Sequence, residues 1–266
     1  MTAAERLTLI QVKIERAKEH IATLHKVIQG FFDSKPYQVS TKRDASRRLV
    51  YYLSKVQPTP ICIAVIAGDA IQNLRTALDH MAWQLFLIGT GGAISNKHIY
   101  FPIADDATAY NSRLEKLRQK GVRTDAIRAL NAIQPYKGGK DEKLWVLNEL
   151  NNRDKHRLLV TVGSSYQSMN IGAYARKMLI NATGGQFPIP KIDDYLRPNE
   201  NLFPLKVGDK LFIDAVDAQE NSELDFRFNV VLNEPRVIEG APLIDTLNNF
   251  SYIVNKTVLL FEPCLT

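Results

Sequence analysis

The chain has 266 residues, of which 45% are hydrophobic and 23% are charged, and this composition is ordinary for a globular protein. Its length allows one large domain or two modest ones. Because only two cysteines are present, neither a disulfide framework nor a cysteine-rich zinc site is available.

The net charge of +6 is unevenly distributed along the chain. Residues 1–160 hold 25 Lys and Arg against 15 Asp and Glu, whereas residues 161–266 hold 9 against 13. A basic first part suggests a polyanionic partner, although most charges on a basic protein simply solvate its surface.

Two long amphipathic helices are predicted in the first third of the chain. Apolar residues recur in steps of three and four from the N-terminus, as expected for a helix that packs against another helix: Leu7, Ile10, Ile14, Ala17, Ile21, Leu24, Ile28 and Phe31. Residues 35–56 indicate a short hairpin or an extended arm. The second helix is expected over residues 60–87, with Pro60 in its first turn.

Targeting and membrane segments are not predicted. The opening residues, MTAAERLTLIQVKIER, form a helix pattern without a signal-peptide core. The most apolar stretch, residues 58–88, is interrupted by Asp69, Arg75 and Asp79. We therefore expect a reduced, cytoplasmic protein that does not span a membrane.

The rest of the chain changes from helices to strands. GTGGAISN, at residues 89–96, is typical of a loop. Shorter helices are then expected at 107–119, 124–133 and 141–155. Strands are expected within residues 158–162, 169–175, 177–182, 210–216 and 224–232, before a last helix at 242–261.

Helices followed by strands predict an α+β fold rather than alternating α/β. We expect an N-terminal helical bundle over residues 1–160. A mostly antiparallel β-sheet with a closing C-terminal helix is expected over residues 161–266. That helix can return to the bundle and make the two parts one compact unit.

The second long helix carries a polar stripe on an otherwise apolar surface. Its residues 71–85 read IQNLRTALDHMAWQL, with Asn73 and His80 in the stripe and Arg75 and Asp79 beside it. Arg75 and Asp79 are four residues apart, so they can form an ion pair. This stripe must meet solvent, another polar helix or a ligand.

The spacing Arg-x-x-x-x-His in RTALDH resembles the motif of the HEPN superfamily (higher eukaryotes and prokaryotes nucleotide-binding domains). The wider combination of GDAIQNLRTALDHMAWQL, FPI, IQPY and NNRDKHR is similar to a group of uncharacterised bacterial proteins. The HEPN resemblance implies a helical bundle that acts as a homodimer. It also implies a metal-independent endoribonuclease or RNA-binding protein, a class that includes toxins and defence effectors.

The same resemblance implies roles for individual residues. Arg75 would hold the scissile phosphate, because a guanidinium clamps phosphate with two N–H groups. His80 would be the general acid or base for attack by the RNA 2′-hydroxyl. From their position on the same helix, we expect Asn73 and Asp79 to orient these two catalytic residues.

A second polar feature is the helix KLWVLNELNNRDKHR. Asn151 and Asp154 stand at inward-facing positions where the pattern expects apolar residues. Since a buried carboxylate needs a partner, we expect both residues to meet the polar stripe and orient it, with His156 extending the site. The alternative for the basic residues is ordinary helix-end chemistry.

Other features support weaker interpretations. The five histidines lack a metal-binding spacing, so no metal or other cofactor is expected. A series of basic residues suits either phosphate contacts or a solvated face: Arg113, Lys116, Arg118, Lys120, Arg123 and Arg128. The alternative to an RNA-directed function is a non-enzymatic protein-interaction or ligand-binding module, in which the polar stripe is a structural or dimer contact.

Overall fold

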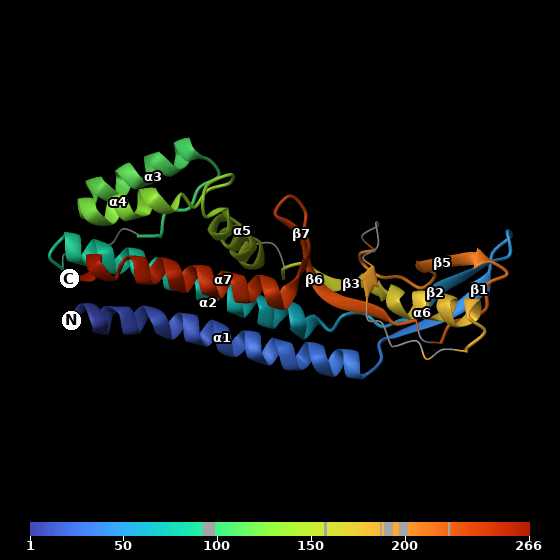
Figure 1. The fold of residues 1–266 in the computed structure, drawn as a ribbon. Coiled ribbons are helices and arrows are strands. Elements are labelled where there is room, and N and C mark those ends of the chain that lie inside the picture. The colour runs from blue at the N-terminus through green and yellow to red at the C-terminus, as the bar shows by residue number, and fades with distance from the viewer. Residues whose placement is uncertain (93–98, 157–158, 187, 189–193, 197–201, 223) are drawn as a thin grey trace.

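The computed structural model describes all residues except 93–98, 157–158, 187, 189–193, 197–201 and 223. The protein is elongated, with a helical part at one end and two small β-sheets at the other (Figure 1). Both termini lie at the far end of the helical part. This mixture of helices and antiparallel strands confirms the α+β class.

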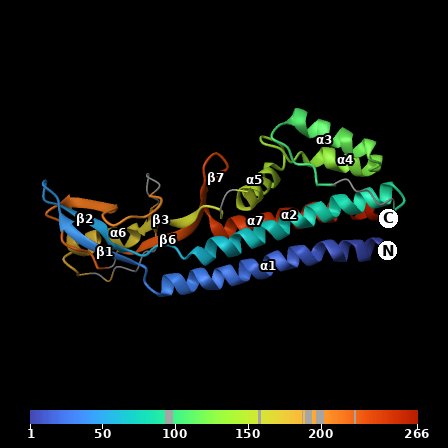
Figure 2. The same cartoon turned by 180° about the vertical axis from the view of Figure 1, so that it is seen from behind.

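Three long helices form the body of the helical part: α1 (Ala3–Asp33), α2 (Ile61–Gly89) and α7 (Leu243–Leu260). They lie side by side in both views of the molecule and contact one another pairwise (Figures 1 and 2). The buried face of α1 is the predicted apolar seam, from Leu7 to Phe31. The first turn of α1 is fixed by a capping box between Thr2 and Glu5. The last helix therefore returns to the bundle.

α2 is the central helix, because it contacts α1, α7 and α5. Its length and mean hydropathy would allow it to cross a bilayer, and it alone meets that test among the described residues. Half of its most apolar window is buried inside the protein. That position is typical of the core helix of a soluble domain.

Three shorter helices complete the helical part: α3 (Ala107–Gln119), α4 (Thr124–Ile133) and α5 (Glu142–His156). α3 and α4 have the predicted bounds, and α5 differs from its prediction by one residue at each end. Residues 93–96 of the predicted loop lie outside the described residues, and Gly89 ends α2. The apolar spacing of three and four residues thus predicted the bounds of these three helices to within one residue.

Two antiparallel sheets make the other end of the molecule. The first has the order β1 (Tyr37–Arg43), β2 (Arg48–Val56) and β5 (Lys210–Val216). The second has the order β4 (Tyr195–Leu196), β3 (Val162–Asn170), β6 (Phe226–Glu234) and β7 (Ile238–Pro242). Residues 35–56 therefore form the hairpin rather than an extended arm, and it pairs with a strand from the second half of the chain.

Three strand predictions are wrong in whole or in part. Residues 159–161 of the strand expected at 158–162 precede β3, which begins at Val162. Residues 171–182, expected to contribute to two strands, form the helix α6 (Ile171–Ala182). This segment is rich in Ala, Arg, Lys, Met and Leu, which favour helix, and poor in β-branched residues. Tyr174 of α6 packs edge-on against Phe212 and donates a hydrogen bond to Asp214 at 2.9 Å. α6 is thus a cover for the first sheet, and a short 3₁₀ helix (Glu262–Leu265) ends the chain.

Candidate functional site

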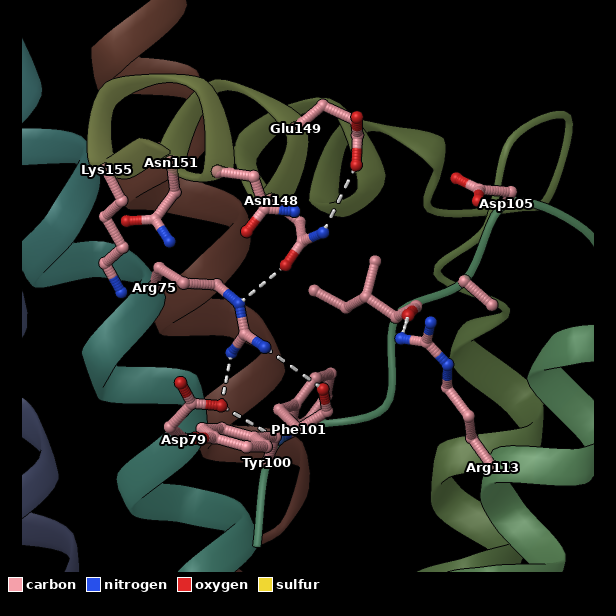
Figure 3. Close-up of a pocket in the computed structure, with 13 residues that line it drawn as sticks. Arg75, Asp79, Tyr100, Phe101, Asp105, Arg113, Asn148, Glu149, Asn151 and Lys155 are labelled. Carbon is pink, nitrogen blue, oxygen red and sulfur yellow. Dashed lines mark hydrogen bonds and ion pairs between the residues drawn. The ribbon is translucent and has the colours of Figure 1, made fainter. Parts of the chain in front are cut away.

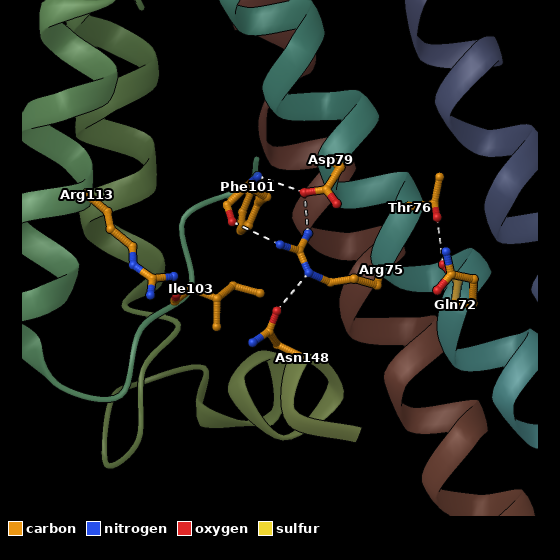
Figure 4. A network of polar contacts seen from close by, with 8 residues as sticks. All are labelled: Gln72, Arg75, Thr76, Asp79, Phe101, Ile103, Arg113 and Asn148. Atoms are coloured by element: carbon orange, nitrogen blue, oxygen red, sulfur yellow. Dashed lines mark hydrogen bonds and ion pairs between the residues drawn. The ribbon is translucent and has the colours of Figure 1, made fainter. Parts of the chain in front are cut away.

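Arg75 lies at the centre of a polar network in the helical part (Figures 3 and 4). It is only 7% exposed. Its guanidinium donates to Asp79 Oδ1 at 2.5 Å, to Asn148 Oδ1 at 2.9 Å and to the Phe101 carbonyl at 3.3 Å. The predicted ion pair with Asp79 is therefore confirmed. The network fixes the guanidinium between α2, α5 and the segment before α3.

That segment, residues 99–105, is attached to the helices by several independent contacts. The Phe101 amide donates to the same Asp79 oxygen at 2.9 Å. The Phe101 ring packs edge-on against Phe261 after the last helix. Ala104 pairs with Tyr136, and Asp105 accepts a hydrogen bond from the indole of Trp145 at 2.9 Å. The FPI segment is thus held at Arg75, and the IQPY segment contacts the chain just after it.

A cavity of about 400 Å³ opens beside this network, and we call it the Arg75 pocket (Figure 3). Its size is in the range of small-molecule and cofactor sites. The side chains that line it are mostly polar, and three are basic and three acidic. Its polar lining consists of Arg75, Asp79, Tyr100, Asp105, Arg113, Asn148, Glu149, Asn151, Asn152 and Lys155.

A second hollow of about 220 Å³ adjoins the pocket, and we call it the α3 groove. Tyr100, Phe101 and Arg113 line both spaces and form the wall that they share. Arg113 donates to the Ile103 carbonyl, which directs its side chain toward the shared wall (Figure 4). Lys116 and Lys120 line the groove beyond it, and the Tyr100 side chain is 57% exposed at the junction. The groove is therefore basic, with one accessible aromatic ring.

His80 lies away from the Arg75 pocket. Its side chain is exposed, and it does not line that cavity. Partial desolvation and the charge of Lys13 on α1 lower the pKa of His80, and the carboxylate of Asp79 partly opposes them. Within one chain, the structure does not bring the Arg75 and His80 side chains together.

The orienting residues expected from the sequence have different positions. Asp79 and Asn151 line the pocket with Arg75. Asn73 instead donates to the Asp69 carbonyl one turn earlier on α2, at 2.8 Å. Asn151 is 3% exposed, and its Oδ1 has no hydrogen-bond partner among the described residues. The side chain of His156 lies outside the described part of the chain.

Asp154 packs directly on the backbone of α2. A Cβ atom added at Gly68 would lie 2.6 Å from Asp154 Oδ1, so only glycine leaves room for this carboxyl group. That oxygen is buried without a partner among the described residues, while the Val160 amide donates to the carboxylate. Burial, with a smaller contribution from the nearby Asp69, raises the pKa of Asp154. Asp154 thus joins α5 to α2 beyond the Arg75 pocket.

Several lining residues were not predicted as site residues. Asn148 is one of them, and because it lies three residues before the predicted Asn151, the polar face of α5 was a usable signal for it. Tyr100 and the Phe101 carbonyl had no comparable signal, because their place depends on how residues 99–105 fold back. Tyr51 of β2 is 3% exposed and packs in the sheet part, so its ring is not available to stack on a base.

Comparison of the chain with protein-family models, with curated proteins and with solved structures finds no match. Within the described residues, no three His, Cys, Asp or Glu side chains are grouped so that they could hold a metal ion. The chemistry of the site therefore has to be inferred from its own side chains.

Proposed function

We propose that this protein binds single-stranded RNA, with the backbone along the α3 groove and one nucleotide in the Arg75 pocket. The observation that carries the proposal is the shared wall of the two spaces. A groove lined by Arg113, Lys116 and Lys120 adjoins, at the exposed Tyr100 ring, a polar pocket with a fixed guanidinium.

Each part of this surface suits a part of a nucleotide. Lysine and arginine side chains neutralise phosphates, and a tyrosine ring stacks on any base. A guanidinium has five N–H groups, and three of the Arg75 nitrogens each use one in the network. Two N–H groups remain on a side chain that is already held in place, so little side-chain entropy would be lost on binding.

We propose that the protein is HEPN-like. The catalytic version of this proposal is that it also cleaves the RNA that it binds. His80 is accessible and its pKa is lowered, so a neutral imidazole is available as a general base near neutral pH. Because the His80 and Arg75 side chains are apart in one chain, His80 of a second copy would have to approach the pocket. The catalytic proposal therefore requires a homodimer, whereas RNA binding does not.

We also place the protein in the cytoplasm. Both cysteines are free, with Cys62 exposed and Cys264 buried. A free exposed thiol is favoured in a reducing compartment.

The alternative is a non-enzymatic interaction module. The three hydrogen-bond partners of Arg75 favour this alternative, because they already accept three of its five N–H groups without any ligand. In that case the network serves only to hold residues 99–105 against α2 and α5.

Fluorescence anisotropy with a labelled single-stranded RNA tests the binding proposal. The Lys116→Ala/Lys120→Ala variant should bind about tenfold more weakly, and its salt slope should fall by about 2. The matched control, Lys18→Ala/Lys26→Ala, removes the same charge from exposed positions on α1 and should bind like the wild type. Equal loss in both variants, or no binding by the wild type, would overturn the proposal.

The catalytic proposal is tested separately by incubating RNA with the protein in EDTA. We expect products with 2′,3′-cyclic phosphate ends, and we expect the folded His80→Ala variant to lose this activity. If folded wild-type protein binds RNA but does not cleave it, the catalytic proposal is wrong and the binding proposal stands.

A further inference from the structure

The Arg75 pocket has an acidic wall that the binding of a phosphate does not explain. Glu149 of α5 and Asp105 lie across the pocket from Asp79 (Figure 3). Glu149 is half-buried, and its Oε1 is 3.5 Å from Asn148 Nδ2. Its Oε2 accepts no hydrogen bond from the described residues. Asp105 uses one oxygen for Trp145, so a second acceptor oxygen remains on this wall.

Such a wall selects for a ligand that donates hydrogen bonds. Among the four RNA bases, guanine presents two adjacent donors, N1–H and the N2 amino group, which match the two oxygens of one carboxylate. Cytosine and adenine each offer one amino group beside a ring nitrogen acceptor, which a carboxylate repels. Uracil offers a single N–H between two carbonyls.

The basic residues of the pocket suit the neighbouring edge of the same base. Guanine carries the O6 and N7 acceptors there, and arginine is the usual donor to them. Arg75 and Arg113 both line the pocket, from α2 and α3 respectively, and Arg75 retains two N–H groups (Figure 3). An adenine would place its amino group toward these cations instead.

We propose that the Arg75 pocket binds a guanine base, with Glu149 as the residue that determines the specificity. The inference rests on the proposed RNA-binding function and names the nucleotide that enters the pocket. Glu149 accepts hydrogen bonds from N1–H and the N2 amino group, Asp105 adds a further acceptor, and the arginines face O6 and N7. The ribose and phosphate then lead out toward the α3 groove.

The test compares the binding of GMP, AMP, CMP and UMP by titration calorimetry, together with two short RNAs that differ by one guanine-to-adenine change. Wild-type protein should prefer GMP over the other three by about tenfold, the discrimination that one good bidentate contact gives. The Glu149→Gln variant should lose this preference and still bind RNA. The control, Glu142→Gln, changes the same residue type on the same helix but outside the pocket and should keep it.

The possible outcomes separate the two proposals. Equal binding of the four nucleotides by a protein that still binds RNA through Lys116 and Lys120 would overturn the guanine inference alone. A preference for GMP that Glu149→Gln leaves unchanged would also overturn it. Binding of GMP that depends on Glu149, with no binding of RNA, would support the base assignment and overturn the proposed RNA-binding function.

Discussion

The two sides of α2 differ in the burial and the contacts of their ionisable residues. On the side that faces α5, Arg75 is buried and has three hydrogen-bond partners from three parts of the chain. On the side near α1, His80 is exposed. Its pKa is lowered by partial desolvation and by the charge of Lys13, and the charge of Asp79 opposes this. Five residues along a helix amount to about 140° around its axis, which accounts for the separation.

This difference shows what a short sequence motif can and cannot specify. RTALDH fixes the spacing of the two side chains along one helix, and the rest of the fold decides what each meets. Arg75 forms hydrogen bonds that connect α2, α5 and residues 99–105, whereas His80 is exposed and accessible to a partner. Substitutions on the two sides should therefore have different effects on stability and on titration in solution.

The largest expected effect is on the Arg75 side. Arg75→Ala leaves Asp79, Asn148 and the Phe101 carbonyl without their common donor, so we expect the free energy of unfolding to fall by roughly 3 kcal/mol. His80→Ala removes an exposed side chain and should change it by less than about 0.5 kcal/mol. Urea denaturation measures both, and similar effects of the two substitutions would contradict the comparison.

The next effect concerns Gly68, further along the same side of α2. In Gly68→Ala the new methyl group meets the Asp154 carboxyl group, so the free energy of unfolding should fall by about 2 kcal/mol. The control is Gly30→Ala in α1, where a Cβ meets nothing within 4 Å and where alanine should stabilise the helix by about 0.5 to 1 kcal/mol. Stabilisation by both substitutions would show that Asp154 is not packed on Gly68.

A smaller effect should follow from the raised pKa of Asp154. When a carboxyl group has a higher pKa in the folded than in the unfolded state, its protonated form is favoured by folding. Its contribution to stability is therefore fully present below the unfolded-state pKa and is lost as the pH rises through the folded-state pKa. Asp154→Asn cannot titrate, so wild type minus variant stability should decrease over that range. A flat difference curve from chemical denaturation would contradict the assignment.

The smallest effect is expected on the His80 side. Because Lys13 contributes to lowering the pKa of His80, Lys13→Ala should raise the midpoint of its NMR titration. Lys26→Ala, on the same helix, should leave that midpoint unchanged. If Lys13→Ala has no effect, the imidazole does not face α1 as the structure places it.

The sequence predicted one part of this site much better than another. Contacts within a helix or between helix faces follow from periodicity, and so the Arg75–Asp79 pair and the inward position of Asn151 were expected. The Phe101 carbonyl and the Tyr100 ring could not be expected. They lie at the Arg75 pocket because Phe101 packs on Phe261 and Ala104 pairs with Tyr136, and such contacts between distant segments leave no periodic pattern.

The error at α6 has a related cause. Short apolar runs separated by turn residues predicted strands here, although Ala, Arg, Lys, Met and Leu favour a helix. The helix is held in place by tertiary contacts of Tyr174 with the first sheet. Intrinsic propensity was the better guide to this segment than its neighbours.

The most direct test of the RNA site is photocrosslinking. A single-stranded RNA that carries one guanine flanked by 4-thiouridine is irradiated with the protein, and the crosslinked peptides are identified by mass spectrometry. We predict crosslinks at Tyr100 and within residues 107–119, since these border the Arg75 pocket and the α3 groove. Crosslinks confined to the sheet of β1, β2 and β5, at the opposite end of the molecule, would contradict the account.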